Sequence, residues 1–436
     1  MLRGLILSKV KFLILILVFF HLNSCAYFDE EEDTILPGKR ESIFSDQDEV
    51  IVKANKRIVI DEPFTIYSWN QQYQNIRNHL FHFKSKPNLK LLKKIDLGDL
   101  NFKNIEYIVS PVINGNIIFY SDNNFNLYAK NLKNGKTIWK IKLKKEKSES
   151  FSFVGGMSLD DKFLYITTGL GNIYCVDILK AKIQWTKSLR IQFSRPPLTY
   201  KNKLFVISDD NQTFALNKLS GETLWSHIGN IEEISIIGGS KPIIDENILI
   251  VTYSSGEIYA LNENDGSTIW LDNLSSSSFF VKSNVNDIQA PATIEGDNVY
   301  VPSFSDKLIV YDLKTGKEKW DIKVTSINPL VISGDTMFIL DTSGKLLCLD
   351  KINGKLLWAV QLRVSKKGEE IIWYGPLLST NKLLVIGSDG LVLSLSPFTG
   401  KILSKTKFNE KILTNPFQVK ENIFLISEEG TLFILG

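Results

Sequence analysis

The residue types that most often catalyse reactions or bind metals are sparse in this chain. His79, His82 and His227 show no metal-binding spacing, so each is expected to pack or to face solvent. No Gly-x-Ser-x-Gly nucleophile motif is present. The pairs Gly155-Gly156 and Gly238-Gly239 precede no helical pattern, which favours close strand packing over phosphate binding. These residues predict a protein that is not an enzyme and that has no cofactor and no metal.

The most regular feature is a phrase that ends in tryptophan. An Asn, Asp, Ser or Thr residue is followed by Gly, and Trp follows four residues after that glycine. The tryptophans are Trp139, Trp185, Trp225, Trp270, Trp320 and Trp358. Ala181 replaces the glycine before Trp185, and a seventh copy that begins at Thr399-Gly400 ends in Leu403. A repeat of roughly 40 to 50 residues is typical of propellers and solenoids.

Each repeat contains four short segments with strand composition. Residues 290–293, 298–302, 307–311 and 318–322 show them well, because turn residues such as Thr315-Gly316 separate them. β-Branched and aromatic residues favour strands, and glycine in such turns accepts the positive φ of a tight hairpin. The repeats show no helical period. They therefore predict an all-β fold, a β-propeller built from four-stranded antiparallel blades.

The two ends of the repeat region complement each other. Seven glycine-turn phrases predict seven blades, and an eighth begins at Thr414 but stops at the C-terminus without its outermost strand. Residues 91–97, Leu-Leu-Lys-Lys-Ile-Asp-Leu, resemble an outer strand that has no blade before it. Pairing of the two ends would close the ring and remove two exposed sheet edges, which predicts eight blades. Seven blades is the alternative, in which the C-terminal segment only covers a neighbouring blade.

Cysteine positions agree with an eight-bladed ring. Cys175 and Cys348 lie at the same place in the third strands of the second and sixth repeats. Blades four apart face each other across such a ring, which is too far for the roughly 6 Å Cα separation of a disulfide. Both are expected as small buried hydrophobic residues.

The N-terminus has the order of a bacterial secretion signal. Basic residues precede an apolar run over residues 12–20, which is too short to span a bilayer. Residues 22–25, Leu-Asn-Ser-Cys, resemble the lipobox of bacterial lipoproteins. This resemblance implies a signal peptide over residues 1–24 and a lipid on Cys25, and Ala26 implies sorting to the outer membrane. An ordinary signal peptide with a chance cysteine is the alternative.

The remaining domain boundaries follow from composition. Residues 25–61 include the acidic cluster Asp29–Asp33 and lack periodicity, so we expect a flexible tether. Residues 62–90 form an irregular lead-in segment, and residues 91–436 form the propeller. A net charge of +3 over 436 residues argues against nucleic acid as a partner.

One repeat carries a family resemblance. Residues 311–320, Tyr-Asp-Leu-Lys-Thr-Gly-Lys-Glu-Lys-Trp, resemble the tryptophan-docking repeat of pyrroloquinoline-quinone-type propellers, and the likeness extends from about Trp69 to the C-terminus. Within that superfamily, a lipobox followed by a single eight-bladed ring is similar to the BamB-like family of outer-membrane β-barrel assembly lipoproteins. This resemblance implies a non-catalytic scaffold on the periplasmic face of the outer membrane, anchored by its lipid.

The same resemblance implies the partners. Loops on one rim would bind the periplasmic POTRA domains of the β-barrel insertase subunit, and outer blade edges would pair with nascent outer-membrane proteins by β-augmentation. Two other functions share the repeat: a different envelope scaffold, such as a cell-wall binding propeller, and a quinoprotein dehydrogenase. Dehydrogenases of that type have long insertions and typically two adjacent cysteines, and this chain has neither.

Candidate partner-binding residues come from two loops. Residues 287–289, Asp-Ile-Gln, resemble an Asp-Val-Asp phrase of the family that contacts the insertase, which points to Asp287 and Gln289. Residues 188–195 match a second family loop and carry Arg190 and Arg195. Aromatic residues often anchor interfaces, which adds Phe193, Phe279 and Phe280. In the alternative reading, the rings pack against the sheets and the arginines are solvated.

The six tryptophans of the repeat are expected to lock neighbouring blades together. Replacing one of them with alanine should cost about 3–5 kcal/mol of stability.

Overall fold

The computed structural model describes residues 50–53, 56–98, 109–122, 124–143, 153–230, 238–274, 290–303, 307–366 and 368–436. The predicted signal peptide and Cys25 lie outside these residues. Strands and turns make up the described chain, and within it no helix has the length and apolarity needed to cross a membrane.

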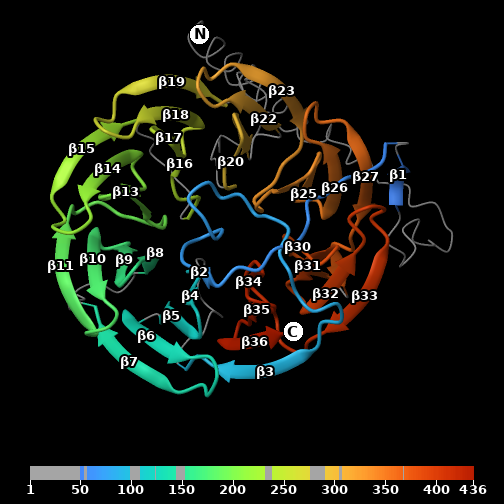
Figure 1. Ribbon diagram of the computed structural model, residues 1–436, viewed down its shortest axis with the longest axis horizontal. Helices are drawn as coiled ribbons and strands as arrows, with labels where there is room; N and C mark the ends of the chain where they lie inside the picture. The colour runs from blue at the N-terminus through green and yellow to red at the C-terminus, as the bar shows by residue number, and fades with distance from the viewer. Residues whose placement is uncertain are drawn as a thin grey trace, which may run out of the picture. The chain divides into compact units, whose positions relative to one another are not determined.

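Eight antiparallel four-stranded blades form a ring, with the first strand of each blade nearest the axis and the fourth strand outermost (Figure 1). Blade 1 contains β4 (Val112–Asn114), β5 (Ile117–Ser121), β6 (Asn126–Asn131) and β7 (Thr137–Lys142). Blade 2 contains β8 (Val154–Asp160), β9 (Phe163–Thr168), β10 (Asn172–Asp177) and β11 (Lys182–Ser188). Blade 3 contains β12 (Leu198–Tyr200), β13 (Lys203–Ile207), β14 (Gln212–Asn217) and β15 (Thr223–Ile228). Blade 4 contains β16 (Ile243–Asp245), β17 (Ile248–Thr252), β18 (Glu257–Asn262) and β19 (Thr268–Asn273).

The second half of the ring follows the same plan. Blade 5 contains β20 (Thr293–Glu295), β21 (Asn298–Pro302), β22 (Lys307–Asp312) and β23 (Glu318–Lys323). Blade 6 contains β24 (Val331–Ser333), β25 (Thr336–Leu340), β26 (Lys345–Asp350) and β27 (Leu356–Gln361). Blade 7 contains β30 (Trp373–Ser379), β31 (Lys382–Gly387), β32 (Leu391–Leu395) and β33 (Ile402–Lys407). Blade 8 contains β34 (Phe417–Val419), β35 (Asn422–Ile426), β36 (Thr431–Leu435) and β3 (Leu91–Asp96). Outside this plan, β1 (Val50–Lys53) pairs with β27, β2 (Ser68–Trp69) pairs with β4, and β28 (Ser365–Lys366) pairs with β29 (Glu369–Glu370).

Closure of the ring confirms the prediction of eight blades. β3 pairs antiparallel with β36, and the register aligns Ile95 with Leu432 and Asp96 with Thr431. The N-terminal strand thus supplies the outer strand that the C-terminal blade lacks. Figure 1 shows β3 beside β36, next to the C-terminus. The alternative of seven blades is excluded.

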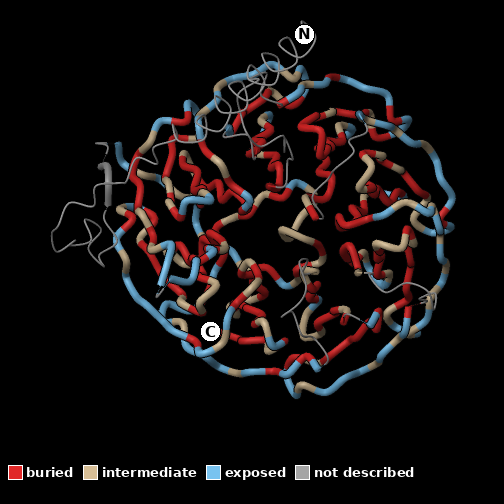
Figure 2. Tube along the Cα trace, turned by 180° about the vertical axis from the view of Figure 1, so that it is seen from behind, coloured by how far each residue is buried: buried red, intermediate tan, exposed pale blue. Residues whose placement is uncertain are grey.

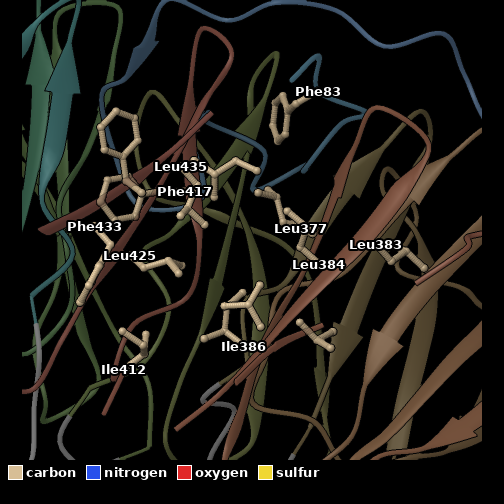
Figure 3. Packing of buried hydrophobic residues seen from close by; sticks show 14 of the residues in the cluster. Phe83, Leu377, Leu383, Leu384, Ile386, Ile412, Phe417, Leu425, Phe433 and Leu435 are labelled. Atoms are coloured by element: carbon tan, nitrogen blue, oxygen red, sulfur yellow. The ribbon is translucent and has the colours of Figure 1, made fainter. Parts of the chain in front are cut away.

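Burial in each blade follows the position of the strand. The inner strands are apolar and mostly buried because each blade packs between two others. The outer strand alternates, and β23 exposes Glu318, Lys319 and Asp321 while Trp320 and Ile322 are half-buried. Figure 2 shows this difference as an exposed outer ring around a buried interior. The largest hydrophobic cluster joins blades 6, 7, 8 and 1 to the lead-in segment; Figure 3 shows Phe83, Leu377 and Phe417 within it.

The repeated tryptophans lie at the junctions between blades. In five of them the indole Nε1 donates to a backbone carbonyl in the third-to-fourth-strand turn of the next blade. The pairs are Trp139 with Ile178, Trp185 with Lys218, Trp225 with Glu263, Trp270 with Leu313, and Trp358 with Pro397, at 2.8–3.1 Å. In four of these five, all but Trp139, the turn glycine of the next blade packs on the same ring. The sixth tryptophan, Trp320, makes the same contact, and a Cβ on Gly354 would lie 2.8 Å from it.

A lysine takes the place of tryptophan where the ring closes. Lys93 of β3 pairs with Ile434 directly beside the register shift of blade 8. Trp270 of β19 holds the same position in blade 4, where it pairs with Ala260 directly beside the register shift. The Lys93 Nζ donates to the carbonyls of Leu132 at 3.3 Å and Lys133 at 2.7 Å in the third-to-fourth-strand turn of blade 1. The junction between blades 8 and 1 therefore keeps the hydrogen bond without the indole.

The lead-in segment circles the inside of the ring in blade order (Figure 1). Its residues bond in turn to the first strand or first hairpin of seven blades. The pairs are Ile66 with Lys420 in blade 8, Tyr67 with Gly115 in blade 1, Asn70 with Leu159 in blade 2, Ile76 with Ile244 in blade 4, Arg77 with Ile294 in blade 5, His79 with Ile332 in blade 6, and Phe83 with Leu378 in blade 7. These bonds satisfy backbone groups on the inner edges of the first strands.

The last residues of the predicted tether also contact the propeller. β1 pairs with the outer edge of β27, and residues 56–61 continue along blade 6. Lys56 Nζ lies 2.7 Å from Asp350 Oδ2 and 3.1 Å from Asp335 Oδ2. The described chain therefore begins at the outer edge of blade 6.

Candidate partner-binding rim

The two rims of the propeller carry different connections. Because strands alternate in direction, the first-to-second and third-to-fourth strand turns share one rim, which we call the hairpin rim. The second-to-third strand turns and the connections between blades share the other rim, which we call the loop rim. The lead-in segment bonds to first hairpins at Gly115 and Lys420, so it lies at the hairpin rim. The loop of residues 189–197 connects blades 2 and 3 and therefore belongs to the loop rim, as do the described ends of the connection between blades 4 and 5.

Residues 189–197 connect blades 2 and 3 and are held against the turn of blade 2. Leu189 N donates to Gly171 O at 2.9 Å. A Cβ on Gly171 would lie 2.7 Å from Ile191 N, so this approach requires glycine, which also has φ of 75° there. Arg190 has φ of 58° and is exposed. Its guanidinium is therefore available to a partner at the loop rim.

Phe193 and Arg195 of the same loop are buried. Phe193 packs in a cluster with Tyr165 and Leu204, and its carbonyl lies where a Cβ on Gly155 would be, at 2.2 Å. The burial of Phe193 agrees with the alternative in which the aromatic rings pack against the sheets. The burial of Arg195 does not agree with the alternative in which the arginines are solvated. Both side chains support the loop from below rather than form its surface.

Arg195 and its neighbours join blades 2, 3 and 4. The Arg195 guanidinium donates to the carbonyl of Thr252, while Thr167 Oγ1 donates to the Arg195 carbonyl at 2.8 Å. A Cβ on Gly239 would lie 3.0 Å from Arg195 Nε. A Cβ on Gly156 would lie 2.5 Å from Pro196 Cα. The glycine pairs thus permit close packing, as the sequence predicted.

The carboxylate of Asp209 also holds the loop of residues 189–197 in place. Ser194 donates to Asp209 Oδ1 through its backbone N at 3.0 Å and through its hydroxyl at 2.5 Å. Burial raises the pKa of Asp209, and the hydrogen bonds from Ser194 oppose that rise. Asp209 Oδ2 and Arg195 Nε are buried without a hydrogen-bond partner.

A buried polar network between blades 3 and 4 was not found from the sequence. Glu257 accepts hydrogen bonds from Asn230, Ser255 and Tyr259. Asn211, at φ of 62°, accepts from Ser254 and donates to Asn230 O. The polar residues around Asn211, Asn230 and Ser254 have the composition of ordinary turns. The sequence therefore did not indicate the hydrogen bonds that join these turns. The network positions residues 229–230, where the next loop begins.

The histidines have the packing roles that were expected. His79 Nε2 lies 3.0 Å from Ile332 O, and His82 Nδ1 lies 2.6 Å from Asp61 O. His227 Nδ1 lies 2.9 Å from the hydroxyl of Tyr253. Burial lowers the pKa of all three imidazoles. Cys175 and Cys348 are buried free thiols. Burial raises the pKa of Cys175 to about 12, and burial also raises the pKa of Cys348.

The other predicted partner-binding residues lie outside the described part of the chain. Phe279, Phe280, Asp287 and Gln289 belong to the connection between blades 4 and 5. The ends of that connection are described: β19 ends at Asn273 and β20 begins at Thr293.

One cavity is found beside the lead-in segment in the hub. A cavity of about 20 Å³ remains between the lead-in segment and the neighbouring blades, lined by residues that include Trp69, Tyr73, Leu80 and Phe417. This volume accommodates about one water molecule. Among the described residues, no group of three or more His, Cys, Asp or Glu side chains is placed to hold a metal ion.

Comparisons with known proteins agree with the repeat. A family model described as outer membrane protein assembly factor BamB matches residues 123–360, which is more than half of the chain. An uncharacterized protein of Rickettsia prowazekii (strain Madrid E) is 24% identical over 283 residues, which cover 64% of this chain and 66% of that protein. The chain thus spans slightly less than two thirds of that relative's length.

Solved structures share the fold at low identity. BamB from Moraxella catarrhalis superposes with a TM-score of 0.67 at 18% identity and covers 80% of this chain and 99% of that chain. A quinohemoprotein alcohol dehydrogenase from Comamonas testosteroni has the same TM-score of 0.67 at 12% identity and covers 85% of this chain and 80% of that chain. The fold therefore occurs in an assembly factor and in an enzyme.

Proposed function

Because the chain belongs to the family of the outer membrane protein assembly factor BamB, we propose that it is a non-catalytic scaffold of the machinery that assembles β-barrel proteins in the outer membrane. In this proposal it binds the periplasmic POTRA region of the insertase subunit and assists insertion of outer-membrane proteins. The family match over residues 123–360 is the observation that carries the proposal.

The occupied hub supports a scaffold rather than a quinoprotein dehydrogenase. A cofactor site generally needs about 300 Å³ or more. The lead-in segment fills the axis at the hairpin rim and leaves a cavity of about 20 Å³. The two cysteines of the propeller lie in different blades, so they cannot form the ring of adjacent cysteines that such enzymes typically have. Both features of the described residues favour the scaffold over the dehydrogenase.

The loop rim is the surface that we propose for the insertase. Arg190 stands exposed on a loop that Gly171 and the buried Phe193 hold in place. An exposed arginine on a rigid support suits an ion pair with an acidic partner surface, because little side-chain and loop entropy is lost on binding. Asp287, Gln289, Phe279 and Phe280 remain proposed contacts on the connection between blades 4 and 5.

We further propose that a lipid on Cys25 anchors the chain to the outer membrane. Labelling of cells with radioactive palmitate should mark the wild-type protein and should not mark a Cys25→Ser variant. Palmitate on the Cys25→Ser variant, or none on the wild type, would contradict the anchor while leaving the scaffold role open.

Affinity purification of the full-length tagged protein from gently solubilised envelopes tests the scaffold role. Wild type should recover the β-barrel insertase, and Arg190→Glu combined with Asp287→Arg should recover at least fivefold less. Lys136→Glu is the matched control, since Lys136 is an exposed cation on the hairpin rim. That control should recover as much insertase as wild type.

The possible outcomes separate the parts of this proposal. Absence of the insertase from the wild-type sample would contradict the scaffold role and favour another envelope partner. Equal recovery by wild type and by the double variant would place the contact elsewhere than on these two loops. Loss of recovery only in the Lys136→Glu variant would move the contact to the hairpin rim.

A further inference from the structure

Within the described part of the chain, the outer edge of blade 6 differs from the outer edges of the other seven blades. In seven blades the fourth strand is the last strand of its sheet. In blade 6, β1 pairs antiparallel with β27 and makes a fifth strand, with Val52 opposite Ala359 and Lys53 opposite Trp358. A segment from outside the repeat therefore occupies the backbone groups that the other outer strands leave facing outward.

The composition of β27 explains why this edge is occupied. Its sequence is Leu-Leu-Trp-Ala-Val-Gln, whereas each of the other seven outer strands contains a charged residue or, in β15, a histidine. Charged residues on an edge strand prevent pairing with other chains. At the position after the repeated tryptophan, β7 has Lys140 and β27 has Ala359. The edge of β27 thus lacks the usual protection and accepts a strand.

Burial at equivalent positions sets β27 apart from three other outer strands. The residue before the repeated tryptophan is 49% exposed in Ile138, 43% in Leu224 and 44% in Ile269, but 4% in Leu357 of β27. Leu357 belongs to the largest hydrophobic cluster, against which Ile58 and Ile60 pack. The segment that enters with β1 therefore accompanies the burial of an apolar edge.

The attachment of this segment is strong after β1 and weak within it. Residues 56–61 are held by the ion pairs of Lys56 and by the Asp61 carboxylate, which accepts from Gly334 N at 2.7 Å. By contrast, β1 has four residues, and its register shifts between Val50 and Val52. A short irregular strand pairs weakly, although its attachment at Lys56 gives it an effective concentration of about 1 mM or more. Release of β1 from the edge should therefore cost less free energy than release of residues 56–61.

We propose that the outer edge of β27 is a strand-acceptor site, in which β1 is a displaceable internal occupant. Its ligand is an extended segment of another polypeptide that is rich in β-branched residues, as β1 with its sequence Val-Ile-Val-Lys is. Such a segment would donate and accept backbone hydrogen bonds along residues 356–361 by β-augmentation. This inference goes beyond the proposed function and does not depend on the insertase.

A labelled peptide with the sequence of residues 48–55, Asp-Glu-Val-Ile-Val-Lys-Ala-Asn, is the probe for this site. The full-length chain with Ile51→Pro and Val52→Pro should bind it at least tenfold more tightly than wild type, measured by fluorescence anisotropy. Only alternate amides of β1 can face β27, so prolines at two consecutive positions remove one facing donor in either register. With this donor removed, β1 can no longer occupy the edge. A peptide with the same two prolines should not bind either protein.

A charge on the edge should block the site without disturbing the ring. Ala359→Lys in the proline background introduces the residue that β7 carries at the equivalent position. We expect it to weaken peptide binding at least tenfold. Near-ultraviolet circular dichroism verifies that each variant keeps its tryptophan packing.

Hydrogen exchange provides the second measurement, should Ala359→Lys unfold. Amides of residues 356–361 should exchange at least tenfold faster in the proline variant than in wild type, and added peptide should restore their protection. Equal peptide binding by wild type and the proline variant would overturn the proposal. Exchange at this edge that is unchanged by the prolines, or unaffected by bound peptide, would overturn it as well.

Discussion

Glycine and tryptophan act as a pair at the residue scale, but the two partners come from neighbouring blades. The sequence places each tryptophan four residues after a glycine of its own blade. In the structure, the ring of Trp270 packs instead on Gly316, which belongs to the next blade. Local spacing therefore identified both residues and their repeat, while the contact between them depends on how successive blades stack.

Gly316→Ala tests this contact, and Gly296→Ala in the same blade is its matched control. Both glycines have positive φ, 69° and 57°, but a Cβ would lie 2.6 Å from Trp270 at Gly316 and would meet nothing within 4 Å at Gly296. The control should cost about 1 kcal/mol for its left-handed backbone. Gly316→Ala should cost at least about 1 kcal/mol more, measured by urea unfolding; equal costs would show that the indole contact is not tight.

Lys241 is a buried cation that holds the lead-in segment. Its Nζ donates to Asn75 O at 2.9 Å, and burial holds the pKa of this ammonium well below its ordinary value. The unfolded chain therefore binds more protons than the folded chain at pH values between the two pKa values. The contribution of Lys241 to the free energy of unfolding is lowest below the pKa that Lys241 has in the folded state. It rises as the pH increases toward the pKa that Lys241 has in the unfolded state.

Lys241→Met should consequently stabilise the protein at neutral pH. We expect a gain of about 1 kcal/mol or more, because burial of an ammonium without a charged partner is costly and Asn75 O keeps the backbone N of Asn78 as a donor. The gain should shrink as the pH is raised toward 10. Thermal unfolding at several pH values measures it, and a loss of stability that is constant with pH would contradict the assignment.

At the scale of elements, one strand decides whether the sheet array is open or closed. β3 comes from the N-terminal side of the repeats and completes the blade of β34, β35 and β36. Its strand-like composition was visible in the sequence, and the missing outer strand of the last blade supplied the partner. The substitution of Lys93 for the docking tryptophan was not visible, because its acceptors lie about 40 residues away in blade 1.

Truncation of the C-terminus measures the contribution of this closure. A chain that ends at Gly430 lacks β36, which leaves β3 and β35 with unpaired edges, and it should lose cooperative unfolding and become sensitive to trypsin at Lys93 and Lys94. A chain that ends at Leu435 loses only the pair between Gly436 and Lys90 and should unfold as wild type does. Retention of the wild-type melting temperature by the shorter chain would contradict ring closure through β36.

At the scale of the whole ring, the lead-in segment organises the hub. It bonds to seven blades in order and lies at the hairpin rim, whereas the loop that carries Arg190 lies at the loop rim. At the hairpin rim the axis is thus occupied by the chain itself. The proposed partner contact at Arg190 is on the opposite rim.

Addition of pyrroloquinoline quinone with Ca²⁺ should leave the melting temperature of the full-length protein unchanged. A ligand that binds only the folded state at 100 times its Kd stabilises by about 2.7 kcal/mol, which a thermal shift detects. The quinohemoprotein alcohol dehydrogenase prepared without its quinone is the positive control. A rise in melting temperature that depends on quinone concentration would favour the dehydrogenase function.

The sequence by itself determined the blades, their number and the family, because strand composition, glycine turns and repeat spacing depend on residues close together in the chain. It also identified Arg190 as a loop residue and the glycine pairs as packing positions. Only the tertiary structure decided that Phe193 and Arg195 are buried, that Lys93 replaces a tryptophan, that the lead-in segment circles the hub and that β1 covers β27. Each of these depends on contacts between residues far apart in sequence, whose burial and pairing are set by the packing of neighbouring blades.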